Sequence, residues 1–391
     1  MKPRAAFFMT HPTQYHAPWF RALAARPEIS IHVYYGLQPS AEMQGKDFGV
    51  GFEWDVPLLD GYPNSFLKNV AAKPGWGFRN LDTPELRDLI PRRDFDTWVI
   101  NGWTTKSEWL AIRTCWNSGI PMMVRGDSTL IDRRNLGTRA LKRLLLGRWI
   151  PRFSRYLTVG RLNEQYYEHY GAQRHRFVPV RHFVDNDWFE GRAKVERARR
   201  QVLRSQWGID ASALVFLFVG KFMEKKRPVD TIRAISRVSP GRSVHLLMVG
   251  EGELKEACRS TAHELGVPVA FAGFLNQSRM PEAYAAADVL ILPSGFQETW
   301  GLVVNDAMAS GLPAIVSDKV GCAPDLVIAG VTGETFPSGN LAALAERMDQ
   351  YIRMPGEESK QGLQAAAHIR DYSLEAATEN TVRAIVDVSS S

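Results

Sequence analysis

The stretch that most constrains the fold is residues 287–317, where two short apolar runs flank a helical pattern. Residues 287–293 and 314–317 have the length and composition of buried strands. Between them, residues 302–310 carry apolar side chains at helical spacing, and Gly311 and Pro313 mark the end of that helix. The stretch therefore predicts a strand–helix–strand unit, the building block of a parallel α/β sheet.

Two acidic residues lie where the first strand of this unit leads into the helix. Glu298 precedes the helix, Gly301 begins it, and Asp306 follows about one and a half turns later. Amides at a helix N-terminus suit a phosphate, and carboxylates accept hydrogen bonds from sugar hydroxyls, as they do in dinucleotide folds. The pattern points to a nucleotide-sugar. The alternative is an ordinary unit of this kind with an acidic residue at the start of its helix.

This spacing resembles the Glu-x7-Glu signature of the retaining family-4 glycosyltransferases, which have the GT-B fold, with Asp306 in place of the second Glu. The resemblance implies that Glu298 contacts the donor sugar and Asp306 the nucleotide ribose. It makes the neighbouring Thr299, Gly301 and Leu302 candidates for donor binding as well.

A second donor-binding segment follows the apolar run at residues 215–219. Gly220 permits a close backbone approach, and Lys221 and Lys226 provide point charges for a diphosphate. The segment resembles the family pattern Gly-Arg-x4-Lys, with Lys221 in place of Arg. Gly250 begins a turn similar to the family's Gly-x-Gly turn, and by the same resemblance Phe274 is a candidate for contacting the base.

The first half of the chain also predicts strands that end in polar residues. These strands are residues 5–9, 96–100 and 121–124, and ligands bind at the carboxyl edge of a parallel sheet. On the acceptor side we expect His11, Gln14, Asn101 and Arg125.

Three residues are candidates for catalysis: Asp127, His16 and Glu298. Asp127 is placed to orient an acceptor hydroxyl or to take its proton. The alternative for Asp127 is an N-cap or turn residue, and for each His a hydrogen-bonded loop residue.

The 391 residues suffice for two domains of ordinary size. We expect an α/β protein of GT-B type, with two Rossmann-like domains whose parallel sheets face a central cleft. Residues 1–190 form the acceptor-side domain and 191–210 a linker. Residues 211–372 form the nucleotide-sugar-binding domain, and 373–391 a helix that crosses back to the first domain.

Composition and charge bear on the compartment and the partners. The three cysteines form no disulfide framework or metal-ligand pattern, and no apolar run approaches the roughly 20 residues that span a bilayer. We expect a cytoplasmic protein. Residues 133–155 contain eight Arg or Lys, no acid and interleaved apolar side chains. This segment is either a helix on the anionic inner face of the membrane or a domain helix with solvated charges. No nucleic-acid recognition motif is present, so nucleic acid is not an expected partner.

The resemblance implies sugar transfer from a nucleoside-diphosphate sugar, UDP- or GDP-linked, to a hydroxyl of a glycan or lipid-linked acceptor. The resemblance also implies that the anomeric configuration is retained, and we expect the transfer to serve bacterial polysaccharide or glycoconjugate synthesis. We expect no cofactor beyond the co-substrate, and metal-independent transfer, because no Asp-x-Asp metal motif is recognised. The alternatives are a nucleotide-sugar epimerase of the same fold and a non-catalytic nucleotide-sugar-binding subunit. An NAD oxidoreductase is disfavoured, because no Gly-x-Gly-x-x-Gly follows the first strand.

Overall fold

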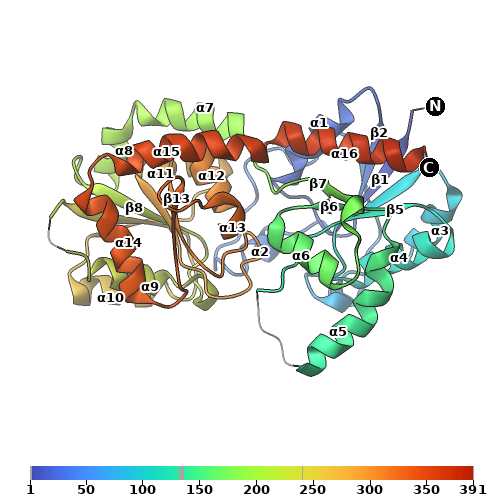
Figure 1. Ribbon diagram of the computed structural model, residues 1–391, viewed down its shortest axis with the longest axis horizontal. Coiled ribbons are helices and arrows are strands. Elements are labelled where there is room, and N and C mark those ends of the chain that lie inside the picture. The colour runs from blue at the N-terminus through green and yellow to red at the C-terminus, as the bar shows by residue number, and fades with distance from the viewer. Residues whose placement is uncertain (1, 132–135, 240, 391) are drawn as a thin grey trace. The chain divides into compact units, whose positions relative to one another are not determined.

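The computed structural model describes residues 2–131, 136–239 and 241–390. The chain forms two compact units (Figure 1). The first contains the residues up to Met43, residues 56–182 and the chain from Leu374 onward. The second contains Gln44–Asp55 and Phe183–Ser373.

The first unit is built on a seven-stranded parallel sheet with the order β3-β2-β1-β4-β5-β6-β7. The order reverses at β1, as in a doubly wound fold, so ligands are expected beside the carboxyl ends of the central strands. The strands are β1 (Arg4–Met9), β2 (Ser30–Tyr35), β3 (Asn64–Phe66), β4 (Thr97–Ile100), β5 (Met122–Arg125), β6 (Arg155–Thr158) and β7 (Phe177–Pro179).

The central strands of this sheet form because they are apolar on both faces. Every residue of β4 and β5 is buried, and β1 is buried after Arg4, which is typical of parallel strands covered by helices on both sides. The helices of this unit are α1 (His16–Ala24), α3 (Leu86–Leu89), α4 (Lys106–Asn117), α5 (Leu136–Trp149), α6 (Arg161–His169) and α16 (Leu374–Ser389), and α2 (Ala41–Gly45) lies where the chain passes into the second unit. The C-terminal helix α16, red in Figure 1, packs on α1 and on β7.

The second unit contains a six-stranded parallel sheet with the order β10-β9-β8-β11-β12-β13. The two parallel sheets confirm the expected α/β class with Rossmann-like domains. Its strands are β8 (Leu214–Val219), β9 (Val244–Val249), β10 (Val269–Gly273), β11 (Val289–Leu292), β12 (Ala314–Ser317) and β13 (Gly333–Phe336). The strand–helix–strand unit expected at residues 287–317 is β11, α12 and β12.

Helices cover this sheet too. They are α7 (Asn186–Arg197), α8 (Arg200–Gln206), α9 (Pro228–Ile235), α10 (Lys255–Leu265), α11 (Met280–Ala286), α12 (Val303–Ala309), α13 (Ala323–Leu326), α14 (Leu341–Arg353) and α15 (Glu357–His368). Most of the segment expected to link the domains is helical. It contains part of α7 and all of α8, and both helices pack on α11. Arg204 of α8 anchors this segment to the sheet, because its Nη2 lies 2.8 Å from Oδ2 of Asp288, the residue directly before β11.

One short segment of the N-terminal half belongs to the second unit. Gln44–Asp55 lies against residues that follow β8 and β10. Asn276 Nδ2 donates to the carbonyl oxygen of Glu53 at 2.6 Å, and the Ser278 amide donates to Asp55 Oδ1 at 3.1 Å. We refer to Gln44–Asp55 as the flap segment.

Candidate functional site

The carboxyl edge of the second sheet brings Lys226 and Glu298 together. Lys226 lies in a short 3-10 turn after β8, Glu298 follows β11, and these strands are neighbours in the sheet. The Lys226 ammonium forms an ion pair with the Glu298 carboxylate, which also accepts a hydrogen bond from Ser294 Oγ at 2.9 Å. Their side chains are only 15% and 12% exposed, so this is a partly desolvated pair. Lys226 and Glu298, which are both expected to bind the donor, are therefore partners of one another.

Lys221 lies at the same edge but has a different partner. Its Nζ is 2.7 Å from Oδ2 of Asp47 in the flap segment and 5.1 Å from the centroid of the Phe48 ring. The Lys221 ammonium holds the pKa of the Asp47 carboxyl below its usual value, through a hydrogen bond. The carboxylate of Asp47 thus contacts the ammonium that the sequence assigns to a diphosphate.

The Phe274 ring is also covered by the flap segment. Its centroid lies 4.4 Å from that of Phe52 and 5.1 Å from that of Phe48. A nucleotide base that stacks on Phe274 would have to displace one of these rings or share its surface.

Two of the glycines expected at the donor site have packing roles. Gly250 has a φ of +136°, and a Cβ there would lie 1.9 Å from the carbonyl oxygen of Gly220. Gly301 has a φ of +100°, and its Cβ would lie 2.8 Å from Leu292 Cδ2. The loops after β8 and β9 therefore need glycine at position 250 in order to approach one another.

The beginning of α12 differs in detail from the expectation. The helix starts at Val303, with Leu302 at the N-cap position, and the Val304 amide donates to the Gly301 carbonyl at 2.9 Å. Thr299 lies in the loop before it, and its carbonyl oxygen would lie 1.9 Å from a Cβ at Gly321, so the two loop backbones are in close contact.

Asp306 points into the interior of the second unit. It is 3% exposed, and the Tyr284 hydroxyl donates to its Oδ2 at 3.4 Å. A ribose hydroxyl would have to reach a carboxylate that already has a protein partner. The ribose contact of Asp306 stays a prediction.

The first unit has a cavity of about 220 Å³ at the carboxyl edge of its sheet. It unites four residues that the sequence singles out: His16, Asn101, Arg125 and Asp127. The other residues that line it are Thr10, Gly102, Trp103, Thr104, Glu108, Gly126, Ser128 and His182. His11 and Gln14 do not line this cavity. His11 packs its ring against Trp76, with 4.4 Å between the centroids.

Arg125 is the charged centre of this cavity. It is 3% exposed, its Nη1 lies 3.4 Å from His16 Nε2, and its Nη2 lies 3.5 Å from His182 Nδ1. Burial, followed by the charge of Arg125, holds the pKa of both imidazoles well below the usual value. Because a guanidinium only donates, both ring nitrogens must accept. His16 Nδ1 then carries the proton and donates to Thr13 Oγ1 at 3.0 Å.

Glu108 is the buried acid of the same cavity. It closes the capping box of α4, where its Oε2 accepts from the Thr105 amide at 2.7 Å. Burial raises the pKa of the Glu108 carboxyl to about 7, against the opposing effect of hydrogen bonds from Thr105 and Thr104. A carboxyl with this pKa is suited to accepting or donating a proton near neutral pH.

Sequence reasoning missed Glu108 and His182, although signals for both exist. Thr105 and Glu108 have the Thr-x-x-Glu spacing of a capping box directly after the exit loop of β4. His182 follows the edge strand β7 at the same edge as Arg125. β7 has three residues and includes a proline, which makes it hard to recognise from sequence.

The expectation of metal independence rests on a wrong premise. Asp-x-Asp pairs are present at Asp94/Asp96 and Asp185/Asp187. Asp96 Oδ2 accepts from the Arg4 amide at 2.7 Å, and Asp185 caps α7. Across the described ranges, no group of three or more His, Cys, Asp or Glu residues is arranged to hold a metal.

Comparison with known proteins gives the class. The family model of the glycosyl transferases group 1 matches residues 199–368, which include β8, β11 and α12. This part of the chain is similar to that family, and the two parallel sheets resemble those of solved structures with a GT-B-like fold.

The chain is also similar to curated relatives in sequence and to solved structures in fold. A D-inositol 3-phosphate glycosyltransferase of Nocardia farcinica is 25% identical over 351 residues, 81% of this chain and 74% of that protein. An uncharacterized glycosyltransferase of Methanocaldococcus jannaschii, MJ1607, is 31% identical over 151 residues, and the match spans only 38% of either protein. The Anabaena protein HepE, solved in complex with UDP, is similar with a TM-score of 0.73 at 15% identity, covering 98% of this chain and 100% of that one. A Rickettsia africae glycosyltransferase has a TM-score of 0.73 at 13% identity, covering 99% of this chain and 98% of that one.

Proposed function

We propose that the protein transfers a sugar from a UDP-sugar to a hydroxyl group of a glycan or lipid-linked acceptor, with retention of the anomeric configuration. The observation that carries the proposal is the Lys226–Glu298 pair at the carboxyl edge of the second sheet, inside the region that matches the family model. UDP is favoured over GDP because HepE, a protein of the same fold, was solved with UDP and with UDP-glucose.

The ion pair suggests how the donor is bound. A diphosphate carries more charge than one carboxylate, so it competes well for the Lys226 ammonium. Once Lys226 turns to the diphosphate, the Glu298 carboxylate is free to accept hydrogen bonds from the sugar. During transfer, negative charge develops on the leaving diphosphate, and Lys226 and Lys221 would stabilise it.

The cavity of the first unit is proposed to bind the acceptor. Arg125, held between two neutral imidazoles, offers a buried positive charge, and Asp127 and Glu108 offer acceptors for a hydroxyl proton. His16 is a poor candidate for the base, because its Nε2 already faces the Arg125 guanidinium.

Metal-independent transfer and a cytoplasmic site of action at the inner face of the membrane also belong to this proposal. The described helices include none that is long and apolar enough to cross a membrane. Helix α5 is the candidate for peripheral contact, since Leu144 is 73% and Leu145 47% exposed beside the exposed Arg143 and Arg148. Leu146 and Trp149 of the same helix pack inward, and Arg133 and Arg134 lie outside the described residues.

A transfer assay tests the proposal. UDP-glucose and related UDP-sugars are incubated with candidate acceptors in the presence of EDTA, and the anomeric proton of the product is read by NMR. The proposal predicts a retained configuration and a loss of turnover in Lys226→Ala, but not in Lys225→Ala, which removes the same charge one residue away. Formation of an epimerised nucleotide-sugar in the absence of an acceptor would indicate the epimerase. Binding of a UDP-sugar without any turnover would indicate the non-catalytic subunit. A requirement for added divalent metal would refute metal independence.

A further inference from the structure

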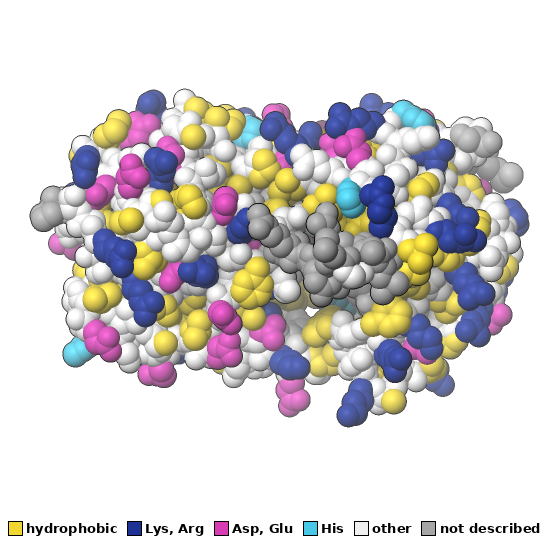
Figure 2. Space-filling view, turned by 60° about the horizontal axis from the view of Figure 1, so that its bottom comes forward, with side chains coloured by type: hydrophobic (Ala, Val, Ile, Leu, Met, Phe, Trp, Pro, Cys, Tyr) yellow, Lys and Arg dark blue, Asp and Glu magenta, His cyan; other side chains and the backbone are white. Residues whose placement is uncertain are grey.

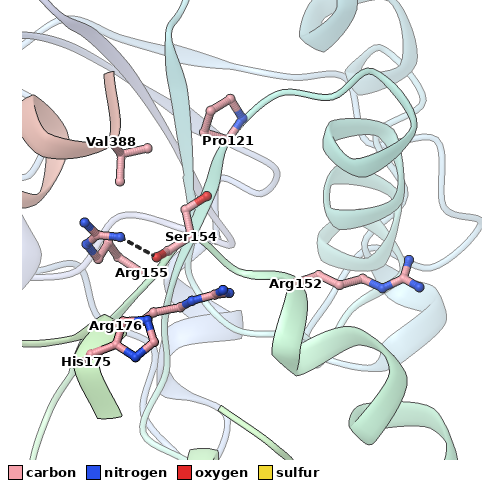
Figure 3. Close-up of a pocket in the computed structure, with 7 residues that line it drawn as sticks. All are labelled: Pro121, Arg152, Ser154, Arg155, His175, Arg176 and Val388. Atoms are coloured by element: carbon pink, nitrogen blue, oxygen red, sulfur yellow. Dashed lines mark hydrogen bonds between the residues drawn. The ribbon is translucent and has the colours of Figure 1, made fainter. Parts of the chain in front are cut away.

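The amino edge of the first unit's sheet carries an arginine-lined pocket of about 410 Å³ (Figure 3). It lies where β5, β6 and β7 begin, whereas the acceptor-side cavity lies where the strands end. A four-residue strand such as β5 is about 13 Å long, so the two sites are separated by about the length of one strand. They share no residue. The pocket is lined by Pro121, Arg152, Ser154, Arg155, His175, Arg176 and Val388.

The topology explains why the basic side chains gather here. Arg155 is the first residue of β6, and Arg176 directly precedes β7, the next strand in the sheet. The Ser154 amide donates to the Met122 carbonyl at 2.8 Å, which sets the start of β6 beside β5. Because all three strands are parallel, the residues that precede them meet at one edge.

The positive charge of this pocket is not balanced by an acid among the lining residues. None of the lining residues is acidic, and Arg152, Arg155 and Arg176 take part in no ion pair among the described residues. A pocket of the second unit shows the contrast. It is also lined by arginines, but there Arg200 pairs with Asp288, and the lining residue Glu358 pairs with Arg242.

The guanidinium groups are held in place while part of their hydrogen-bonding capacity stays unused. Arg176 Nη1 donates to the carbonyl oxygens of Pro151 and Phe153 at 3.1 and 3.3 Å, and Arg155 Nη1 donates to that of Ser154 at 2.9 Å. Each guanidinium has five N–H donors, so most remain available. Arg152 stacks on Trp116, with its Cζ 3.3 Å from the centroid of the ring. Its buried Nη1 has no hydrogen-bond partner among the described residues.

We propose that this pocket binds a phosphate group. Figure 3 shows Arg155, Arg176 and His175 close together on one side, with Arg152 on the other side and pointing away from them. Two guanidinium forks and an imidazole, with no acid among the lining residues, fit an anion with several acceptor oxygens and more than one charge. Pro121 and Val388 form an apolar wall that suits an uncharged substituent on the phosphate. The pocket is independent of the donor site, so this inference does not rest on the proposed function.

The test is titration of the full chain with inorganic pyrophosphate by calorimetry at low ionic strength. Arg155 is the residue to change. Among the described residues, its side chain donates only to the adjacent carbonyl, whereas Arg176 holds the backbone of residues 151–153. We expect Arg155→Ala to weaken binding at least tenfold and Arg155→Lys less than threefold. Arg87→Ala, which removes an exposed charge from α3, should leave the affinity unchanged. Equal affinity in folded Arg155→Ala and in the unaltered protein overturns the proposal.

Pyrophosphate is also expected to bind at the donor site, and hydrogen exchange distinguishes binding there from binding in this pocket. Protection of residues 150–156 and 174–178 supports the inference whether or not the donor site binds. Protection confined to residues 219–228 and 294–304 overturns it.

The phosphate has two potential sources, a soluble phosphate compound or the headgroup of an anionic lipid. Co-sedimentation with vesicles of phosphatidylcholine, with and without phosphatidic acid, distinguishes them. The lipid is assigned if the protein sediments with the anionic vesicles and if both Arg155→Ala and added pyrophosphate abolish this co-sedimentation. Pyrophosphate binding without such retention assigns a soluble ligand, and absence of both forms of binding overturns the proposal.

Discussion

Glu108→Gln tests whether the acid of the first unit's cavity is buried as strongly as its surroundings indicate. Glutamine has nearly the same shape and still accepts the Thr105 amide hydrogen bond, so the capping box of α4 survives. Only the ability to ionise is removed. The comparison therefore isolates the cost of placing a carboxylate in this cavity.

The magnitude follows from the pKa. Burial raises the pKa of the Glu108 carboxyl from 4.5 to about 7, so the folded state holds its proton over a range in which the unfolded state has lost it. At about 1.4 kcal/mol for each pH unit, the free energy of unfolding of the unaltered protein falls by about 3 kcal/mol between pH 4.5 and pH 8 relative to Glu108→Gln. This contribution is fully present below pH 4.5 and is lost as the pH rises through 7.

The assay is urea denaturation read by hydrogen exchange in peptides from α4, which reports the first unit separately from the second. The stability difference between the two proteins should shift by about 3 kcal/mol from pH 4.5 to pH 8, in favour of glutamine at the higher pH. Glu85→Gln, at an exposed position of the same unit, serves as the control. A difference that stays constant with pH would refute the burial of an ionisable Glu108 in this cavity.

Three further predictions concern single residues. Gly250→Ala should lower the stability of the second unit by about 3 kcal/mol or more, because its Cβ would collide with the Gly220 carbonyl, and thermal melting would contradict this if the midpoint were unchanged. Asp47→Ala should strengthen UDP binding up to about fivefold by freeing Lys221 from a half-exposed ion pair, as measured by calorimetry, and weaker binding would show that the flap segment assists the donor. Burial lowers the pKa of His11 to about 4, so acidification protonates this histidine in the unfolded state before the folded state and lowers the free energy of unfolding. His11→Asn should therefore lose less stability than the unaltered protein as the pH falls from 6.5 to 4, and equal losses in the two proteins would refute the burial of His11.

Much of the fold can be predicted from local patterns, because buried parallel strands are short apolar runs and their carboxyl ends share one edge. That rule brings His16, Asn101, Arg125 and Asp127 into one cavity, as the structure shows. It fails for His11, which follows the same strand as His16 but turns its ring to Trp76.

Contacts between distant parts of the chain could not be predicted. Asp47 and Lys221 are 174 positions apart, and no periodicity in the flap segment indicates that it packs on the second unit. Asp306 shows a related limit, since helical spacing sets the direction of a side chain only roughly. Tertiary packing against Tyr284 decides that this carboxylate is buried.

The central claim is that Lys226 exchanges Glu298 for the diphosphate of the donor. Calorimetric titration of UDP into Lys226→Ala and into Lys225→Ala tests it most directly, since the two variants lose the same charge at adjacent positions. The account predicts that UDP binds the unaltered protein, that Lys225→Ala retains this affinity within about twofold, and that Lys226→Ala loses at least tenfold, about 1.4 kcal/mol. Equal affinities for UDP in the two variants would contradict it.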